Sequence, residues 1–520
     1  MRTKKIILNT LAETIPYLIL GIIGFVKVRV IIDHLGSDLN GYYQFINQII
    51  GYLFLIESGF GRAVIYKLYK PFANKDYLHI SEIFNGSRKI FRGIGLAIFG
   101  LIVISTILIP LVFNIESSYQ PAVIISFFII SASYLIAYFG KENSYYALFC
   151  ADQKKYIFSL IFNGLKIIDD LLIILVAFYF KSLISIALVI LIIKIIEEIT
   201  IRIVAKKHFP FVNKTKKEDI SSFKMTKDLI WHQLSFLVSN NVDMVVLMYF
   251  INPFIVSVYA TYNFIARFLN ELTTRINNIF SYAFGNMFAA KEEERSYQIH
   301  DEYFILSTFL SLIIALTFMV SIRPFVNVWI DNSAYKINYI TVVMFSLNLF
   351  LWTIYSPLIA VINAKGLYKE SKHIVIITAL INVLGSITLV ALLKNQSISI
   401  IITGILIATV ISSLYNIIAR AKLVKKLAFP KLKLKDMLMG YLFYILIFIS
   451  LALPFFYLEG IVFNYSSNII TSLITIVITF LIIVIFALVL LLITKPNTKL
   501  VLSRIPILFK NRRVNHDEKY

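Results

Sequence analysis

Long apolar runs separated by short polar connections dominate the pattern of this chain. Runs such as SLITIVITFLIIVIFALVLLLI stay apolar over about 20 residues, the length with which an α-helix crosses a hydrocarbon core of ~30 Å. These runs lack the apolar–polar alternation that membrane-spanning β-strands require. The pattern therefore predicts an all-α integral membrane protein.

The apolar windows predict fourteen transmembrane helices. The stretch 156–205 is divided into two spans at Lys181, because fifty residues of continuous helix would be ~75 Å long. The predicted spans are 11–32, 42–65, 91–113, 121–140, 156–180, 182–205, 228–251, 254–280, 302–322, 337–362, 370–393, 398–420, 437–458 and 468–494.

The basic residues give these spans an orientation. Of the 50 Lys and Arg residues, most lie at the N-terminus, in the connections from even to odd spans, or in the C-terminal tail. The opposite connections hold only Lys181, Arg323, Lys336 and Lys394. Because basic residues are retained on the cytoplasmic side, both termini are predicted to be cytoplasmic, in a multi-pass protein of the plasma (inner) membrane.

Composition agrees with this topology and narrows the function. The chain is 59% hydrophobic, and its formal charge of +21 is explained by basic cytoplasmic connections that attract anionic inner-leaflet lipids. Nucleic acid is therefore not expected as a partner. The connections are too short for a folded catalytic domain, and no P-loop, H-E-x-x-H or C-x-x-C motif occurs. The single Cys150 excludes a disulfide framework, and neither a metal nor a cofactor is expected.

Charged residues inside the spans are the candidate functional residues, because each costs about 2.5–3.5 kcal/mol at the bilayer centre and usually faces a polar interior. Lys166/Asp170, Lys194/Glu198 and Arg267/Glu271 have i,i+4 spacing, which predicts ion pairs within one helix. The first span differs: Lys27 and Arg29 have no carboxylate deep in their own helix, since Asp33 lies near its outer end.

The eighth span carries a polar face. Arg29 and Arg267 are the candidates for contact with a phosphate, because the guanidinium fork binds phosphate oxygens bidentately. Glu57 in the second span and Asp243 in the seventh are candidates for binding a coupling proton or sodium ion. The polar face, at spacings of three or four, comprises Asn263, Arg267, Asn270, Glu271, Thr274 and Asn278.

A faint internal repeat divides the chain. The stretch LGSDLNGYYQFINQI before the second span resembles FINPFIVSVYATYNFIARF before the eighth, at matching points of two six-span halves. This predicts two pseudo-symmetric six-helix lobes and two additional C-terminal helices. The predicted divisions are an N-lobe at 1–205, a linker at 206–227, a C-lobe at 228–420, spans 13 and 14 within 421–494, and a basic tail at 495–520.

The whole chain resembles the polysaccharide-flippase branch of the multidrug/oligosaccharidyl-lipid/polysaccharide (MOP) exporter superfamily. The resemblance rests on LGSDLNGYYQFINQIIGYLFLIESGFGRAVIYKLYK, NNVDMVVLMYFINPFIVSVYATYNFIARFLNELTTRINNIF and AVINAKGLYKESKHIVIITALINVLG. It implies export of a polyprenyl-(pyro)phosphate-linked oligosaccharide by alternating access, alongside other polysaccharide-assembly membrane proteins. It also implies a cationic cavity lined by Arg29 and Arg267, with Lys27 and Asp243 nearby.

Three alternatives remain open from the sequence. A cation-coupled multidrug antiporter of the same superfamily predicts a cavity rich in carboxylates and aromatic residues, normally with twelve spans. A membrane polysaccharide polymerase or glycosyltransferase would need larger outward loops with catalytic carboxylates, so an enzyme is not expected. A scaffold without transport activity leaves the charged spans unexplained.

Overall fold

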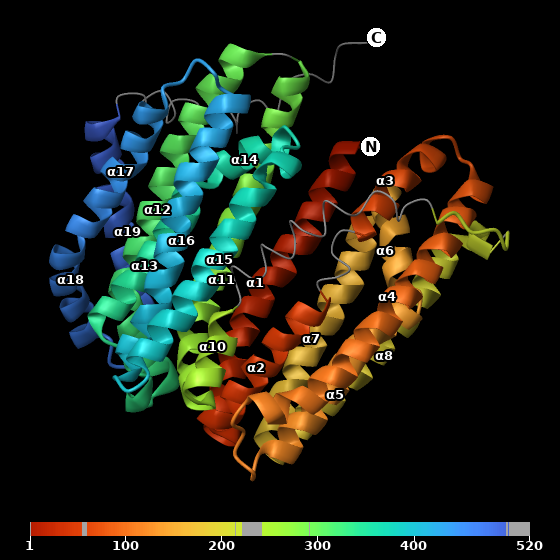
Figure 1. Cartoon of the computed structure of the whole chain (residues 1–520), viewed down its shortest axis with the longest axis horizontal. Coiled ribbons are helices and arrows are strands. Elements are labelled where there is room, and N and C mark those ends of the chain that lie inside the picture. Colours follow the sequence, from red (N-terminus) through yellow and green to blue (C-terminus); the bar gives the residue numbers. More distant parts are fainter. Residues whose placement is uncertain are drawn as a thin grey trace. The chain divides into compact units, whose positions relative to one another are not determined.

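The computed structural model describes residues 2–54, 60–213, 215–220, 242–290, 292–495 and 498. Within these residues the chain consists of α-helices with short 3-10 turns and contains no β-strand (Figure 1). The predicted all-α class is therefore confirmed.

The chain divides into two compact units, Met1–Thr261 and Tyr262–Tyr520. Helix α11 crosses the boundary, and its first turns belong to the first unit. The described helices of the first unit are α1 (Arg2–Leu35), α2 (Ser37–Leu53), α3 (Phe60–Ala73), α4 (Tyr77–Val112), α5 (Gln120–Phe139), α6 (Glu142–Ala151), α7 (Lys155–Phe180), α8 (Leu183–His208), the 3-10 turn η2 (Pro210–Asn213) and α10 (Asp243–Phe250).

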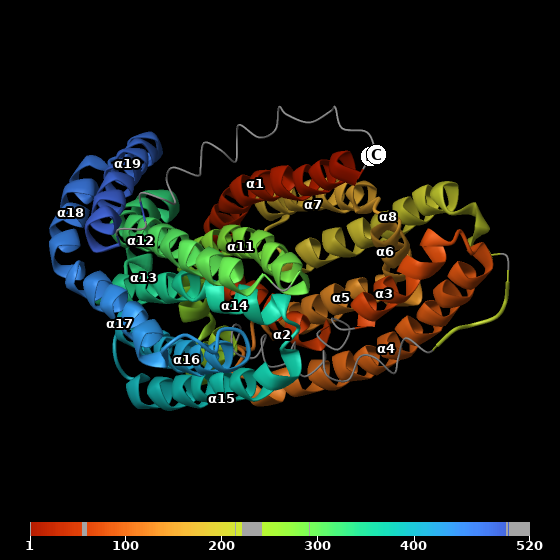
Figure 2. The same cartoon turned by 90° about the horizontal axis from the view of Figure 1, so that it is seen from above.

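The second unit contains most of α11 (Pro253–Ala289). Its helices α15 and α16 pack along each other and lie side by side in both views (Figures 1 and 2). The other described elements are α12 (Glu293–Ile330), η4 (Ser333–Tyr335), α13 (Tyr339–Ile354), α14 (Ser356–Ala364), α15 (Tyr368–Leu393), α16 (Ile398–Leu427), α17 (Leu434–Ser450), α18 (Ala452–Tyr465) and α19 (Ile469–Thr494).

Where the structure describes them, the predicted spans fall on these helices. By length and hydropathy alone, eight described helices can cross a membrane, and α17 with α18, bent by 43°, makes a ninth candidate. Helices α7 and α8 are equally long, but each carries three charged residues within its apolar stretch. The second span comprises α2 and α3, with 55–59 outside the described residues, and only α10 is described of the seventh.

The same helix pairings recur in both units. In the first unit, α5 packs against α4 and α8, so the fourth predicted span contacts the third and the sixth. In the second unit, α13 packs against α12 and α16, so the tenth span contacts the ninth and the twelfth. These matched pairings agree with the pseudo-symmetric halves predicted from the sequence repeat.

Helices α1 and α7 pack along each other and run parallel. Near the start of both helices, Lys155 Nζ lies 2.6 Å from Glu13 Oε1. About fifteen residues further along each helix, or roughly 22 Å, Lys27 Nζ lies 2.7 Å from Asp170 Oδ1. Parallel packing is what the predicted topology requires of the first and fifth spans, which cross the membrane in the same direction.

Pro16 lies inside α1, between these two contacts. A proline has no N–H, so the carbonyl four residues earlier loses its usual helical donor. That carbonyl belongs to Ala12, and Asn163 Nδ2 of α7 donates to it at 3.2 Å. A side chain of the neighbouring helix thus satisfies the backbone group that the proline leaves without a donor.

Helix α2 meets the start of α11 at Gly41. A Cβ atom at this position would lie 1.9 Å from the carbonyl oxygen of Pro253, so a larger residue would force the two backbones apart. Next to Gly41, Asn40 Nδ2 donates at 2.6 Å to Oγ of Ser257, which lies one turn after Pro253 on α11, and both side chains are buried. These contacts place the first turns of α11 in the first unit.

The two C-terminal predicted spans pack on α12 through α18 and α19. The thirteenth predicted span ends at residue 458, but the helix that completes it extends to Tyr465 and includes Glu459. Glu459 is buried, and its Oε1 lies 3.3 Å from Nε of Arg323 on α12. The two helices thus continue beyond the predicted ends of the ninth and thirteenth spans, and this ion pair joins them there.

Candidate functional site: charged groups in the membrane-spanning helices

A cluster of two lysines around two buried aspartates lies between α1 and α7. Lys166 Nζ contacts Asp169 Oδ2 at 2.6 Å and Asp170 Oδ1 at 3.3 Å, which confirms the predicted pairing of Lys166 with Asp170. Lys27 of α1 completes the cluster through its 2.7 Å contact with Asp170. Lys27 therefore has a carboxylate partner, supplied by another helix 143 residues away.

Equal numbers of opposite charges neutralise this cluster. Both aspartates are almost fully buried, and the Lys27 side chain is only 16% exposed. Buried charges persist in proteins when they are paired and hydrogen-bonded. The geometry thus gives Lys27 a role in joining α1 to α7, whereas its predicted role in substrate binding stays a prediction.

Arg29 lies two residues further along α1 in a different environment. Its Nε contacts Asp33 Oδ2 at 3.2 Å, and the two side chains are 38% and 41% exposed. An ion pair with this exposure contributes little to stability, typically below ~1 kcal/mol. The predicted phosphate contact of Arg29 stays a prediction.

A second buried cluster joins α6 to α8, and it corrects the predicted Lys194–Glu198 pair. Lys194 Nζ instead contacts Glu197, at 2.9 Å from Oε1 and 3.0 Å from Oε2. Glu198 accepts the backbone N–H groups of Lys141 at 2.9 Å and of Glu142 at 3.0 Å, where α6 begins. A carboxylate at a helix N-terminus satisfies otherwise free N–H groups, which explains why Glu198 does not pair with Lys194.

Asp243 is buried at the start of α10, and the Tyr259 hydroxyl on α11 donates to its Oδ2. Asp243 was predicted as a functional residue from the sequence, but its contact with Tyr259 was not predicted. The two residues lie in the neighbouring predicted spans seven and eight. A buried carboxylate held by a tyrosine suits the predicted role in ion coupling, and this role stays a prediction. Glu57, the other predicted coupling residue, lies outside the described residues.

The predicted polar face of the eighth span lies on α11, a single helix of 37 residues. Arg267 and Glu271 are exposed and Asn263 is partly exposed, so these polar groups are accessible on the helix surface. The ion pair that the structure assigns to Glu271 is with Arg275, with Nη2 and Oε1 4.0 Å apart. Accessible polar groups on a spanning helix are favoured next to water and not next to lipid.

Among the described residues, no three His, Cys, Asp or Glu side chains are grouped in a way that could hold a metal ion. The arrangement offers paired buried charges, two accessible arginines and a tyrosine-bound carboxylate. These groups can bind and release charged species without covalent chemistry.

Solved structures of membrane transporters match this architecture. The lipid II flippase MurJ, in an inward closed conformation, matches 93% of this chain and 99% of its own length, with a TM-score of 0.63 and 18% identity. An inward-facing multidrug resistance MATE family transporter of the MOP superfamily matches 80% of this chain and 98% of its own, with a TM-score of 0.62 and 11% identity. The chain has the fold of these transporters.

A further match has the same fold. The Vibrio cholerae MATE transporter VcmN in the bent form covers 82% of this chain and 98% of its own, with a TM-score of 0.52 and 16% identity. No protein-family model matches the sequence, and no curated protein does. The predicted fold is thus confirmed, whereas membership of the superfamily and of its polysaccharide branch stays a prediction.

Proposed function

We propose that this protein is a flippase that moves a polyprenyl-(pyro)phosphate-linked oligosaccharide from the cytoplasmic to the outer leaflet, for the biosynthesis of a surface polysaccharide. It works by alternating access and without chemical conversion of the lipid. The membrane potential assists the step, because moving one negative charge outward gains about 2.3 kcal/mol per 100 mV when the inside is negative.

The likeness to a lipid II flippase is the observation that carries this proposal. It extends over 93% of the chain, whereas the two MATE transporters match 80% and 82%. The difference is comparable in size to the C-terminal segment α17–α19, which lies beyond the twelve spans expected of a multidrug exporter. A lipid-linked saccharide is therefore favoured over a small drug as the substrate class.

Arg29 and Arg267 are the proposed phosphate contacts. Both side chains are accessible, and each lies on a helix that crosses the predicted membrane region. A sugar–phosphate head group loses its hydrogen bonds to water on entering hydrocarbon, so polar and cationic groups along the path lower that barrier. Asn263 and Glu271 on α11 offer an amide and a carboxylate for hydrogen bonds to sugar hydroxyls.

The first test replaces these arginines in cells. Arg29→Ala and Arg267→Ala should each reduce surface polysaccharide at least about tenfold, the equivalent of ~1.4 kcal/mol per lost contact. Arg295→Ala is the matched control, because it removes an exposed arginine paired with Glu292 at 3.1 Å outside the predicted spans. Normal polysaccharide in both variants, at equal protein abundance, would exclude the phosphate contacts.

The second test measures transport directly. Purified protein in liposomes receives a fluorescent polyprenyl-pyrophosphate oligosaccharide, and a membrane-impermeant quencher reports the fraction in the outer leaflet. We expect faster equilibration than in empty liposomes and slower equilibration with Arg29→Ala. Equal rates with and without the protein, over a range of imposed potentials, would contradict the flippase assignment.

A cation-coupled multidrug antiporter is the second candidate, favoured by the buried Asp243–Tyr259 pair and by the MATE structures that share the fold. It predicts that cells lacking the protein become sensitive to cationic drugs and keep their polysaccharide. The flippase proposal predicts the opposite result. A gene neighbourhood of glycosyltransferases and a polymerase would also support the flippase.

A further inference from the structure

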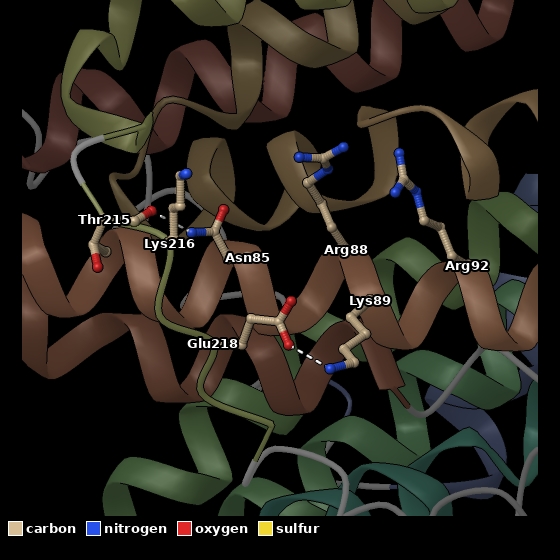
Figure 3. Close-up of a pocket in the computed structure, with 7 residues that line it drawn as sticks. All are labelled: Asn85, Arg88, Lys89, Arg92, Thr215, Lys216 and Glu218. Atoms are coloured by element: carbon tan, nitrogen blue, oxygen red, sulfur yellow. Dashed lines mark hydrogen bonds and ion pairs between the residues drawn. The ribbon is translucent and has the colours of Figure 1, made fainter.

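The N-terminal part of α4 and the segment 215–220 line an open pocket of about 420 Å³ in the first unit (Figure 3). This pocket is separate from the charged groups between α1 and α7. Four of its seven lining residues are basic and one is acidic. The lining residues are Asn85, Arg88, Lys89, Arg92, Thr215, Lys216 and Glu218.

One wall of the pocket is held together by its own polar contacts. Asn85 Nδ2 donates to the carbonyl of Thr215 at 2.8 Å, and Lys89 Nζ lies 2.6 Å from Glu218 Oε2 (Figure 3). These contacts fix the segment along α4. They also neutralise the only carboxylate among the lining residues, so the remaining charge of the pocket is positive.

Arg88 and Arg92 have i,i+4 spacing and project together from the face of α4 opposite Lys89 (Figure 3). Among the described residues, neither guanidinium forms an ion pair with a carboxylate. Nε of Arg88 is buried and has no hydrogen-bond partner. Two adjacent guanidinium groups without a counterion repel each other, and a bound anion would relieve this repulsion.

Further cations lie near Arg88: Lys141, just before α6, and Arg202 and Lys206 on α8. Burial lowers the pKa of Lys141, and the nearby positive charges of Arg88, Arg202 and Lys206 lower it further. Glu198 opposes this effect, but its oxygens already accept two backbone N–H groups. Cations near the pocket therefore outnumber the carboxylates that could pair with them.

The length of α4 places the pocket outside the hydrocarbon. Its 36 residues span ~54 Å, whereas a hydrocarbon core is ~30 Å thick. From Gly93 to Val112 the helix carries no charge, so this part crosses the membrane and the turns with Arg88 and Arg92 lie at its surface. That depth, on the predicted cytoplasmic side, is where lipid phosphates and soluble phosphates are both accessible.

We propose that this pocket binds a phosphate group through Arg88 and Arg92, with Lys216 and Lys141 completing the cationic surroundings. The ligand is a phosphate monoester or pyrophosphate, which presents several oxygens to two guanidinium forks. It is either the head group of an anionic lipid or a soluble phosphate compound. The proposal does not depend on the transported substrate.

The experiment has two arms, both with the full-length protein. In the first arm, protein in nanodiscs of phosphatidylcholine alone is titrated with pyrophosphate by isothermal calorimetry. In the second arm, protein solubilised from vesicles that contain phosphatidic acid is examined for retained lipid by native mass spectrometry. Binding only in the first arm identifies a soluble phosphate, and retention only in the second identifies a lipid head group.

Variants connect either signal to the pocket. Arg88→Gln with Arg92→Gln should weaken binding at least about tenfold, and the effect should shrink at high salt. Lys422→Gln with Lys426→Gln is the matched control, because it removes two cations with the same i,i+4 spacing from an exposed face of α16. Binding equal to wild type in the Arg88/Arg92 variant, or no binding in either arm, would overturn the proposal.

A charge-conserving variant guards against misfolding. Arg88→Lys with Arg92→Lys keeps both charges but loses the planar forks, so binding should weaken severalfold while the elution volume in gel filtration stays that of wild type. If the lysine variant is well folded and binds as tightly as wild type, guanidinium recognition is wrong.

Discussion

The contact between Asn163 and the Ala12 carbonyl gives the sharpest prediction. Ala12 is buried, and Pro16 cannot donate to its carbonyl, so the Asn163 amide at 3.2 Å takes the place of the missing helical donor. A buried carbonyl left without a donor costs about 1–3 kcal/mol. We therefore expect Asn163→Ala to destabilise the protein by that amount.

The proline provides the means of testing this explanation. In Pro16→Ala the new N–H group can donate to the Ala12 carbonyl within α1, so the asparagine becomes dispensable. Asn163→Ala should then cost less than about 1 kcal/mol, the worth of an ordinary hydrogen bond. The double-mutant cycle should show a coupling free energy of roughly 1–2 kcal/mol, well above the ~0.5 kcal/mol by which independent sites deviate from additivity.

The assay is reversible unfolding of the purified protein in mixed micelles with increasing SDS, followed by tryptophan fluorescence. The four proteins of the cycle are compared at one detergent composition, so that differences in unfolding free energy depend on the two residues alone. Equal costs of Asn163→Ala in the wild-type protein and in the Pro16→Ala variant would refute the donor-replacement explanation.

Three other predictions concern packing and charge, and thermal unfolding in detergent checks each. Gly41→Ala should destabilise the protein by about 1–3 kcal/mol, because the new Cβ would meet backbone atoms of Pro253. Gly51→Ala in the same helix has open space around it and should be neutral or stabilising. Similar effects of the two substitutions would contradict the close approach at Gly41. Asp170→Asn should lower the unfolding free energy by about 3–5 kcal/mol. Lys27→Met should lower it by less, because Asp170 keeps its contact with Lys166 when Lys27 is lost. A larger loss in Lys27→Met than in Asp170→Asn would disprove the cluster. Glu459→Gln should loosen α18 from α12 and cost about 1–3 kcal/mol, and a change within ~0.5 kcal/mol would show that the C-terminal helices are held by apolar contacts alone.

Features that depend on local sequence could be predicted. Apolar windows gave the helices, because a spanning segment must satisfy its backbone within itself and show about 20 apolar residues in a row. The Lys166–Asp170 pair followed from i,i+4 spacing alone. The polar face of α11 followed from the same periodicity.

Features that depend on contacts between distant segments could not be predicted from the sequence. Lys27 and Asp170 are 143 residues apart, and neither segment carries a sequence pattern that indicates the contact. Lys194 has carboxylates at both i+3 and i+4, and the choice is made by α6, whose first N–H groups engage Glu198. Helix breaks were equally hidden, because the bend between α17 and α18 divides a continuous apolar run.

The segment 215–220 along α4 has a consequence for proteolysis. Lys216 and Lys217 form a dibasic sequence in a connection, where trypsin usually cleaves. Here the Asp219 N–H donates to the Glu82 carbonyl at 3.0 Å, and a Cβ atom on Gly86 would lie 2.0 Å from the Asp219 carbonyl oxygen. A protease must pull such a segment away from its helix before cutting it. The native protein should therefore resist trypsin at this sequence, and a bulkier residue in place of that one glycine should expose it.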